Sequence, residues 1–354
     1  MSKITVCILF GGRSAEHEVS LSSARSIYDN LDRDKFEIRA LYIDKKGQWR
    51  EVDSPHQSLA ELNAGLFHSF LPWSKNPVSH SLEADIYFPI LHGPYGEDGT
   101  IQGFFEMGDT AYVGATVLAS AVGMDKALAK AVFRQNNLPV VRYAVLCEPD
   151  WKKERQTFLD AVRKDYDPPV FVKPSNLGSS VGITKVRDFS RLEPAIEEAF
   201  LYDRKILVEE GIQGRELECS VLGNEDPKAS LPGEVIPFNE FYDYRDKYIE
   251  GRTSFGIPAE LPPEIVAEVR HISVEAFKSI EGSGMARVDF FLQDRTQKVY
   301  LNEINTIPGF TEISMYPKLW EVSGLPYPRL LEELVFLGLE RYGHKKHGEK
   351  RFSP

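Results

Sequence analysis

The sequence contains few of the features that mark secreted or membrane-spanning proteins. Only three of its 354 residues are cysteines, and Cys7, Cys147 and Cys219 lie far apart in apolar stretches. An odd number of cysteines without metal-ligand spacing predicts buried thiols and a reducing, cytoplasmic location. The most apolar later stretch, residues 111–124, is interrupted by Gly and Thr and is shorter than the ~20 residues needed to cross a bilayer. We therefore expect neither a disulfide framework nor a membrane-spanning segment.

Excess positive charge is also missing. The chain has 42 Lys and Arg against 53 Asp and Glu, which gives a formal net charge of −11. Its one basic cluster, residues 344–351, lies at the C-terminus, where we expect a solvated, disordered tail. A nucleic-acid partner is therefore not expected. The 42% of hydrophobic residues is typical of a globular protein with sizeable cores.

Strands and helices alternate in the predicted first third of the chain. The continuous apolar run 4–10 (ITVCILF) is typical of a strand covered on both faces, and 36–43 and 84–91 predict two more strands. This alternation predicts an α/β fold class with a parallel sheet in the N-terminal part. Further on, we expect two helices, over residues 124–135 and 263–280. We also expect five strands, over residues 169–173, 205–210, 217–222, 286–292 and 299–304.

Two of these strands carry the strongest chemical signal. Residues two apart on a strand face the same side, so Arg287 and Asp289 share one face. Glu303 and Asn305 likewise share a face of the next strand. The short connection 293–297 predicts an antiparallel hairpin, and a symmetric hairpin places Asp289 opposite Glu303 and Arg287 opposite Asn305.

Like charges directly across a hairpin are unfavourable unless something neutralises them. Two carboxylates and a carboxamide oxygen are the hard ligands that Mg²⁺ prefers. The alternative is an ordinary solvated polar face, but apolar residues mark the other face as core. We therefore interpret Asp289, Glu303 and Asn305 as metal ligands.

A Gly/Ser-rich loop follows the predicted strand that ends at Lys173. Glycines let a backbone approach a ligand closely, and its N–H groups, with Ser179 and Ser180, can surround an anion. The loop lacks the Walker A spacing and alone would be as consistent with a simple turn. Lys173 favours phosphate binding, and Lys126, at a predicted helix start, is a second candidate cation, although alone it would be typical of a surface lysine.

Three other segments hold candidate binding residues. Glu209 and Glu216 flank a turn at the end of a predicted strand. Their carboxylates could accept hydrogen bonds from a nucleotide, or they could be ordinary solvated side chains. The aromatic and charged segment 238–255 is typical of a lid that closes over an active site. Glu16 and His92 follow predicted parallel strands at the sheet edge where open α/β sheets bind ligands.

Taken together, these stretches resemble the D-alanine–D-alanine ligase family of the ATP-grasp superfamily. The resemblance runs in order along nearly the whole chain, through GGRSAEHEVSL, HGPYGEDGTIQG, KPSNLGSSVG, YDYRDKY, ARVDFF and NEINTIPGFTEISMYP. It implies a three-domain ATP-grasp architecture, in which an N-terminal parallel α/β domain is followed by central and C-terminal domains that clasp ATP. The expected domains are residues 1–123, 124–215 and 216–354.

The resemblance also implies a reaction. Similar enzymes phosphorylate the carboxylate of one D-alanine with ATP, and the amine of a second D-alanine then attacks the acyl phosphate to give the dipeptide used in peptidoglycan precursors. By this resemblance the ATP-binding residues are Lys126, Lys173, Ser180, Glu209, Ile212, Glu216 and Lys247. Two Mg²⁺ ions, or Mn²⁺, would be held by Asp289, Glu303 and Asn305. Homologues are usually dimers, so a homodimer is expected.

The substrate roles follow from the same resemblance. Glu16 would bind the ammonium group of the first D-alanine with His92 nearby, and Ser314 would bind the carboxylate of the second. Arg287 and the backbone N–H of Gly309 would stabilise the tetrahedral oxyanion, where one such donor contributes about 3–4 kcal/mol. The remaining catalytic candidates, Ser179 and Tyr248, would form a hydrogen-bonded chain with Glu16.

Three alternatives remain open at this stage. Some relatives join D-alanine to D-lactate, although Tyr248 favours the dipeptide. Another ATP-grasp carboxylate–amine ligase is disfavoured because Glu16, Ser179 and Ser314 occur together. A nucleotide-binding regulatory protein without catalysis would lack Arg287 or a metal ligand, and the sequence has all of them.

Overall fold

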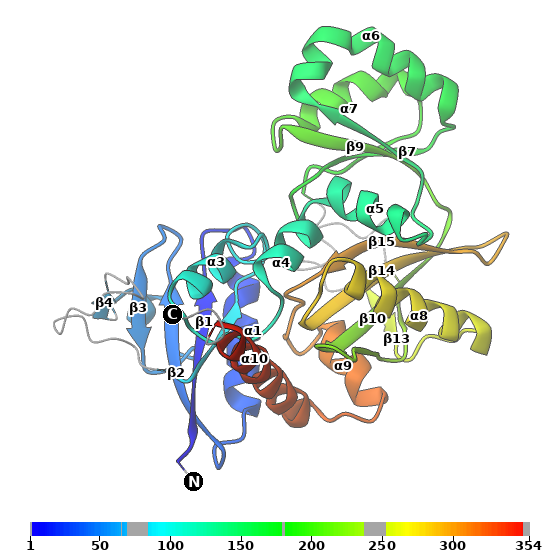
Figure 1. The fold of residues 1–354 in the computed structure, drawn as a ribbon. Coiled ribbons are helices and arrows are strands. Elements are labelled where there is room, and N and C mark those ends of the chain that lie inside the picture. Colours follow the sequence, from blue (N-terminus) through cyan, green and yellow to red (C-terminus); the bar gives the residue numbers. More distant parts are fainter. Residues whose placement is uncertain (1, 65, 69–83, 179–180, 237–252, 350–354) are drawn as a thin grey trace.

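A computed structural model describes residues 2–64, 66–68, 84–178, 181–236 and 253–349. They form three β-sheets with flanking helices, of five, six and four strands (Figure 1). Each sheet has its own hydrophobic core, so the mixed α/β organisation predicted from the sequence is observed. Every helix in these segments is too short or too polar to span a bilayer.

The N-terminal sheet has the strand order β4-β3-β2-β1-β5. Its centre is parallel as predicted, with β1 (Ile4–Gly11) between β2 (Phe36–Ile43) and β5 (Ile86–Ile90). Two further strands that were not predicted, β3 (Trp49–Val52) and β4 (Leu66–His68), extend one edge of the sheet and pair antiparallel. Short edge strands joined by tight turns need no crossover helix and pair antiparallel most readily.

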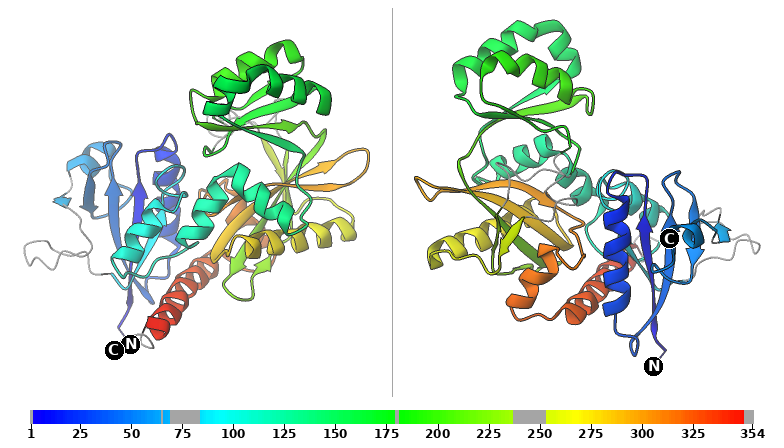
Figure 2. Two further views of the ribbon diagram at one scale, coloured as in Figure 1. Left: turned by 45° about the horizontal axis from the view of Figure 1, so that its top comes forward. Right: turned by 180° about the vertical axis from the view of Figure 1, so that it is seen from behind.

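Helices from both ends of the chain cover this first sheet. The N-terminal helices that cover it are α1 (His17–Asn30), α2 (Leu59–Ala64) and α3 (Thr100–Met107), whereas α4 (Val117–Met124) packs into the core of the C-terminal sheet. The last helix, α10 (Tyr327–Glu349), lies beside them although it is last in sequence (Figure 2). Leu330, Leu331 and Leu334 are fully buried in the core of the first sheet. The chain end therefore completes the N-terminal core.

The expected disordered C-terminal tail is helical over much of its length. Residues up to Glu349 belong to α10. Lys345 contacts Glu106 at 2.7 Å, and Lys346 pairs with Asp109. The prediction of a disordered tail was wrong because a run of basic residues is typical of solvent-exposed chain. The acidic residues that pair with this run lie more than two hundred residues earlier, so the local sequence does not reveal them.

The central sheet forms a separate layer at the top of the molecule (Figure 1). Its antiparallel strands are β6 (Tyr143–Cys147), β9 (Lys205–Glu210), β7 (Val170–Pro174) and β8 (Thr184–Val186). The sheet packs against α6 (Glu148–Asp165) and α7 (Leu192–Ala199). Because β7 and β9 run antiparallel, Lys173 and Glu209 lie on the same face of this sheet, where their side chains form an ion pair.

The C-terminal sheet is built around β10 (Gly214–Gly223), β14 (Gly284–Gln293) and β15 (Val299–Asn305). The short strands β11 (Lys228–Ala229), β12 (Gly233–Ile236) and β13 (Ser254–Gly256) complete it. Its buried face packs against α8 (Pro263–Ser279) and against α5 (Lys126–Gln135), whose Phe133 is fully buried there. Helix α9 (Met315–Val322) follows the sheet. The domain limits after residues 123 and 215 stay a prediction.

Candidate active site

The hairpin of β14 and β15 has the register that the sequence predicts. Asp289 lies opposite Glu303 and Arg287 opposite Asn305, and the register then shifts by one residue after Asp289. These four side chains are half-buried, whereas Val288, Phe290 and Ile304 are buried on the other face. As the alternation of polar and apolar residues predicts, the apolar face of the hairpin lies in the core and the polar face lines the candidate site.

Arg287 joins the acidic groups of this face. Its guanidinium donates two hydrogen bonds to Asp289, both of 2.7 Å, and its Nε lies 3.1 Å from Glu218. Asn305 also donates to Asp289, at 3.0 Å. Burial would lower the pKa of Arg287, but Asp289, Glu218 and Glu303 outweigh it and hold this pKa well above its ordinary value. Arg287 is therefore a permanent, oriented cation at the floor of the site.

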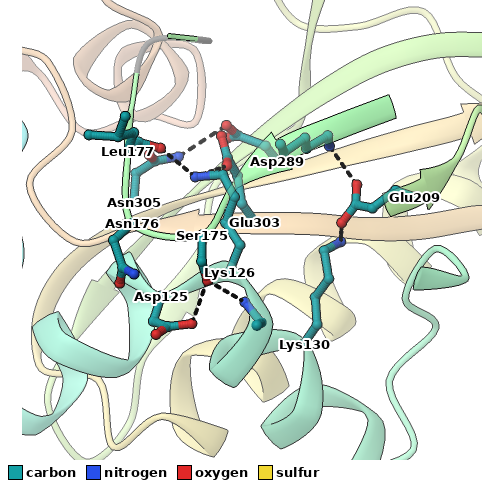
Figure 3. Close-up of polar contacts among 12 residues, drawn as sticks. Asp125, Lys126, Lys130, Ser175, Asn176, Leu177, Glu209, Asp289, Glu303 and Asn305 are labelled. Atoms are coloured by element: carbon teal, nitrogen blue, oxygen red, sulfur yellow. Dashed lines mark hydrogen bonds and ion pairs between the residues drawn. The ribbon is translucent and has the colours of Figure 1, made fainter. Parts of the chain in front are cut away.

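Lys126 connects the hairpin with the loop that follows β7. Its Nζ donates to the carbonyl of Leu177 at 2.7 Å and lies 3.2 Å from Glu303 (Figure 3). Burial opposes its charge, but Glu303 and Glu209 raise the pKa of Lys126 above its ordinary value. The lysine is thus held charged between the Gly/Ser loop and a predicted metal ligand.

The start of α5 fixes this lysine in place. Asp125 caps the helix, since its side chain accepts a hydrogen bond from the Leu128 N–H. The same carboxylate accepts from Ser175 at 2.7 Å and pairs with Lys205. Figure 3 shows Asp125, Ser175 and Lys126 gathered at this helix end. The helix and the loop after β7 are therefore tied together beside the site.

Two buried lysines share the carboxylate of Glu209. Lys130 Nζ lies 3.1 Å from Oε1, and Lys173 Nζ lies 2.5 Å from Oε2. Burial would raise the pKa of Glu209, but Lys130 and Lys173 together lower it. Burial also lowers the pKa of Lys130. Lys130, Glu209 and Lys173 form a connected set, which we call the buried trio.

The hairpin carboxylates are suited to a divalent cation. Asp289 and Glu303 face each other, and the cations Arg287 and Lys126 now contact them. Across the described segments no group of three or more His, Cys, Asp or Glu could hold a metal ion by itself. Mg²⁺ is commonly bound by one or two carboxylates together with substrate phosphates, so Asp289, Glu303 and Asn305 fit such an ion.

The N-terminal side of the site centres on Glu16, at the N-terminus of α1. It is only 9% exposed. A Cβ atom added to Gly93 would lie 2.8 Å from Glu16 Oε2, and one on Gly178 would lie 3.3 Å from it. Gly93 also has a φ of +76°, which an L side chain rarely adopts. Glu16 therefore reaches from the N-terminal sheet to the Gly/Ser loop.

Glu97 is a second carboxylate on this side. Its Oε2 accepts a hydrogen bond of 2.7 Å from the backbone N–H of Gly93. Burial, and then the nearby Glu16, raise the pKa of Glu97 to about 8. Glu97 therefore holds a proton more tightly than an ordinary carboxyl group does.

This pKa predicts how stability depends on pH. Because the folded-state pKa of Glu97 is raised, its stabilising contribution is complete below about pH 4.5 and is lost as pH rises through about 8. We expect Glu97→Gln to be more stable than the wild type at pH 9, by at least about 1 kcal/mol. Urea unfolding at pH 5 and pH 9 measures the difference.

A matched control uses Glu18, whose pKa is lowered by its hydrogen bond with Lys45. Glu18→Gln should gain no stability at pH 9, because this carboxylate is already ionised and paired. Equal gains in the free energy of unfolding at pH 9 in both variants would show that the surroundings of Glu97 do not raise its pKa.

His92 is buried where the N-terminal sheet meets the segment after β15. Its Nδ1 lies 3.1 Å from the carbonyl of Ile307 and its Nε2 lies 3.1 Å from Ser23 Oγ. A carbonyl can only accept, so Nδ1 carries the proton and the Ser23 hydroxyl donates to Nε2. Burial lowers the pKa of His92, which favours this neutral form. His92 thus aligns the Phe310 backbone, whose N–H donates to Ser23 at 3.2 Å.

Gly309 and Ser314 lie together in the turn before α9. A Cβ atom on Gly309 would lie only 2.6 Å from Ser314 Oγ, so a larger residue at this position would displace the Ser314 hydroxyl. The same oxygen accepts a hydrogen bond of 2.9 Å from the Thr311 N–H. Both predicted residues are half-buried at the edge of the site.

The remaining predicted residues fall into two groups. Glu216 and Ile212 are half-buried at the start of β10 and before it, and Glu216 shares the sheet face of Glu218 and Asp289. Four predicted residues lie outside the described segments, as does most of the predicted lid: Ser179, Ser180, Lys247 and Tyr248.

Sequence reasoning missed Glu97, Lys130 and Glu218. Glu97 stands within the HGPYGEDGTIQG motif, yet only its histidine was singled out. Lys130 lies one helical turn after Lys126, a spacing that places both on one face of α5. That spacing was the available signal for Lys130. Glu218 faces Asp289 through a strand pairing that the sequence does not reveal.

Comparison with known proteins agrees with this geometry. Residues 5–115 match the family model for the D-ala D-ala ligase N-terminus and residues 132–336 the model for its C-terminus. A D-alanine–D-alanine ligase of Acetivibrio thermocellus is 47% identical, covering 96% of this chain and 97% of its own length. One from Natranaerobius thermophilus is 45% identical over the whole of both chains.

Solved structures give the same result. The D-alanine–D-alanine ligase of Coxiella burnetii superposes with a TM-score of 0.87 at 38% identity, covering 99% of each chain. The VanG D-Ala:D-Ser ligase of Enterococcus faecalis has a TM-score of 0.84 at 32% identity, covering 95% of this chain and all of its own. The predicted fold class is confirmed, and the chain belongs to the D-alanine–D-alanine ligase family of three-domain ATP-grasp enzymes.

Proposed function

We propose that the protein joins two D-alanine molecules to D-alanyl-D-alanine with ATP, forming ADP and phosphate and supplying precursors of peptidoglycan. Its family membership supports both the ligase activity and the use of ATP. Within the structure, two ion pairs support this assignment most directly: Lys126 contacts Glu303, and Arg287 contacts Asp289. The lysine that we assign to phosphate and the arginine that we assign to the oxyanion thus lie beside the two carboxylates that we assign to a metal ion.

The first chemical step requires a phosphate-binding surface. We assign Lys126, Lys173 and the loop residue Ser180 to the nucleotide phosphates, with Lys247 contributing from the lid. Glu209, Ile212 and Glu216 would line the nucleoside pocket. Asp289, Glu303 and Asn305 would hold Mg²⁺, which when bound neutralises charge on the phosphates. This arrangement lets the carboxylate of the first D-alanine attack the γ-phosphorus and release ADP.

The second step requires an oxyanion site. The amine of the second D-alanine attacks the acyl phosphate carbon, and the tetrahedral intermediate then expels phosphate. We assign Arg287 and the Gly309 N–H to the developing oxyanion, since Arg287 is held rigid by two hydrogen bonds to Asp289. His92 aligns the segment that carries Gly309 through Ile307.

The substrate groups have matching partners. Glu16, a mostly buried carboxylate, would bind the ammonium of the first D-alanine, and Ser314 would bind the carboxylate of the second. Ser179 and Tyr248 would join Glu16 to the loop and lid. We further propose a cytoplasmic homodimer, in keeping with the free thiols of Cys7, Cys147 and Cys219.

An assay of products tests the whole proposal. Purified protein with ATP and Mg²⁺ is given D-alanine, L-alanine, or D-alanine plus D-lactate, and phosphate and the separated products are measured. D-alanyl-D-alanine is expected as the dominant product, with no phosphate release from L-alanine. Dominant depsipeptide would instead support the D-lactate alternative. Folded protein without D-alanine-dependent phosphate release would contradict the ligase assignment.

A further inference from the structure

Lys130 is a buried cation to which the proposed mechanism gives no task. Its side chain is 1% exposed, and so is that of Glu209, its partner. Figure 3 shows Lys130 rising from α5 toward Glu209. Burying a charged side chain is costly unless a partner compensates it, so such a pair calls for a physical reason.

The buried trio contains two cations and one anion. Glu209 is contacted by Lys130 through Oε1 and by Lys173 through Oε2, which leaves a formal net charge of +1. The exposed fraction rises from 1% at Lys130 to 9% at Lys173 and 12% at Lys126. Within the trio, the more exposed positive charge is therefore that of Lys173.

The Lys130–Glu209 pair also joins two parts of the structure. Lys130 is carried by α5, whose neighbouring residues Ala129 and Phe133 are buried in the core of the C-terminal sheet. Glu209 and Lys173 lie on adjacent strands of the central sheet. The pair therefore fixes the position of Glu209 and Lys173 relative to the hairpin that carries Glu303.

We propose that Lys130 is a positioning residue for nucleotide binding, which neutralises Glu209 from the interior and leaves the charge of Lys173 available to the nucleotide. Without Lys130 the full charge of Glu209 would fall on Lys173, and the remaining pair would be neutral. This inference rests on the proposed binding of ATP by Lys173 and Glu209. It gives Lys130 no direct contact with substrate.

Lys130→Met tests the inference without leaving a charge unpaired, because Glu209 and Lys173 still balance each other. We expect the Kd of ADP, measured by calorimetry without D-alanine, to rise about tenfold, as for neighbouring coupled charges. KM for ATP should rise by a similar factor while kcat changes little. Lys130→Arg should restore most of the affinity. The control is Arg134→Met, an exposed cation on the same helix, which should bind ADP like the wild type.

A double-mutant cycle with Glu209→Gln separates the possible outcomes. If Lys130 acts through Glu209, the double variant binds ADP no more weakly than the weaker single variant. Multiplied losses, or normal affinity in Lys130→Met, would overturn the inference. Normal affinity in Glu209→Gln as well would remove Glu209 from the nucleotide site. The ligase proposal is tested separately, by D-alanine-dependent ADP formation in the wild type.

Discussion

Glu303→Gln is expected to lower kcat by about a thousandfold or more, equivalent to about 4 kcal/mol of transition-state stabilisation. The substitution keeps the shape of the side chain but removes the charge that faces Asp289 and contacts Lys126. A neutral amide binds Mg²⁺ weakly, so the phosphates would lose their counter-charge during transfer. D-alanine-dependent ADP release at increasing Mg²⁺ concentration measures the effect.

The fold should survive this change, since Glu303 is half-buried and its core neighbours are untouched. Glu193→Gln, at an exposed ion pair with Arg155 of 2.7 Å, is the matched control and should retain normal turnover. A second readout is the Mg²⁺ dependence of ADP binding, which Glu303→Gln should weaken. Normal turnover and normal Mg²⁺ dependence together would exclude Glu303 as a metal ligand.

Arg287→Lys should reduce kcat by about a hundred- to a thousandfold, the usual cost of losing one oxyanion donor. Lysine keeps the charge but cannot donate two parallel hydrogen bonds to Asp289. The donor would then no longer point at the position of the oxyanion. KM for ATP should change much less, because ground-state binding of the nucleotide does not use this donor. Steady-state kinetics with varied ATP and varied D-alanine separates the two parameters.

Arg215→Lys provides a control of the same chemistry. Arg215 also forms two short hydrogen bonds to a carboxylate, of 2.7 and 2.6 Å to Glu234. It lies on the opposite side of β10 from Glu216 and outside the site. Its replacement should lower stability slightly and leave kcat within about twofold. Similar losses of kcat in both variants would point to a general structural effect.

The hairpin of β14 and β15 was the element best predicted from the sequence. Its register depended on a short symmetric connection and on strict alternation, both of which are local properties of the chain. The apolar runs of β1, β2, β7 and β9 were identified for the same reason. Strands β3 and β4 were missed because they are short, and their pairing depends on neighbours that the local pattern does not show.

The candidate site was predicted only in part. Lys126, Lys173, Glu303 and Asp289 lie in strong local motifs, and the structure brings them together. Glu97 and Lys130 matter through contacts with residues many positions away, such as Glu16 and Glu209. These two side chains become buried and interact with other charges only once the three sheets have packed together. Local patterns therefore identify the residues that we assign to ligand binding better than those that we assign to positioning them.

The packing of α10 against the first sheet affects the order in which the chain can fold. The apolar surface over β1 and β5 is completed by Leu330, Leu334 and Val335, which lie more than two hundred residues later in the chain. Until these residues have been added, the first 120 or so residues lack part of their core and expose it to solvent. Arg341 of α10 then donates hydrogen bonds to the backbone carbonyls of Tyr112 and Gly114, which hold the helix against this sheet. The N-terminal sheet of a nascent chain therefore cannot complete its core until α10 has been synthesised, however early its own strands emerge.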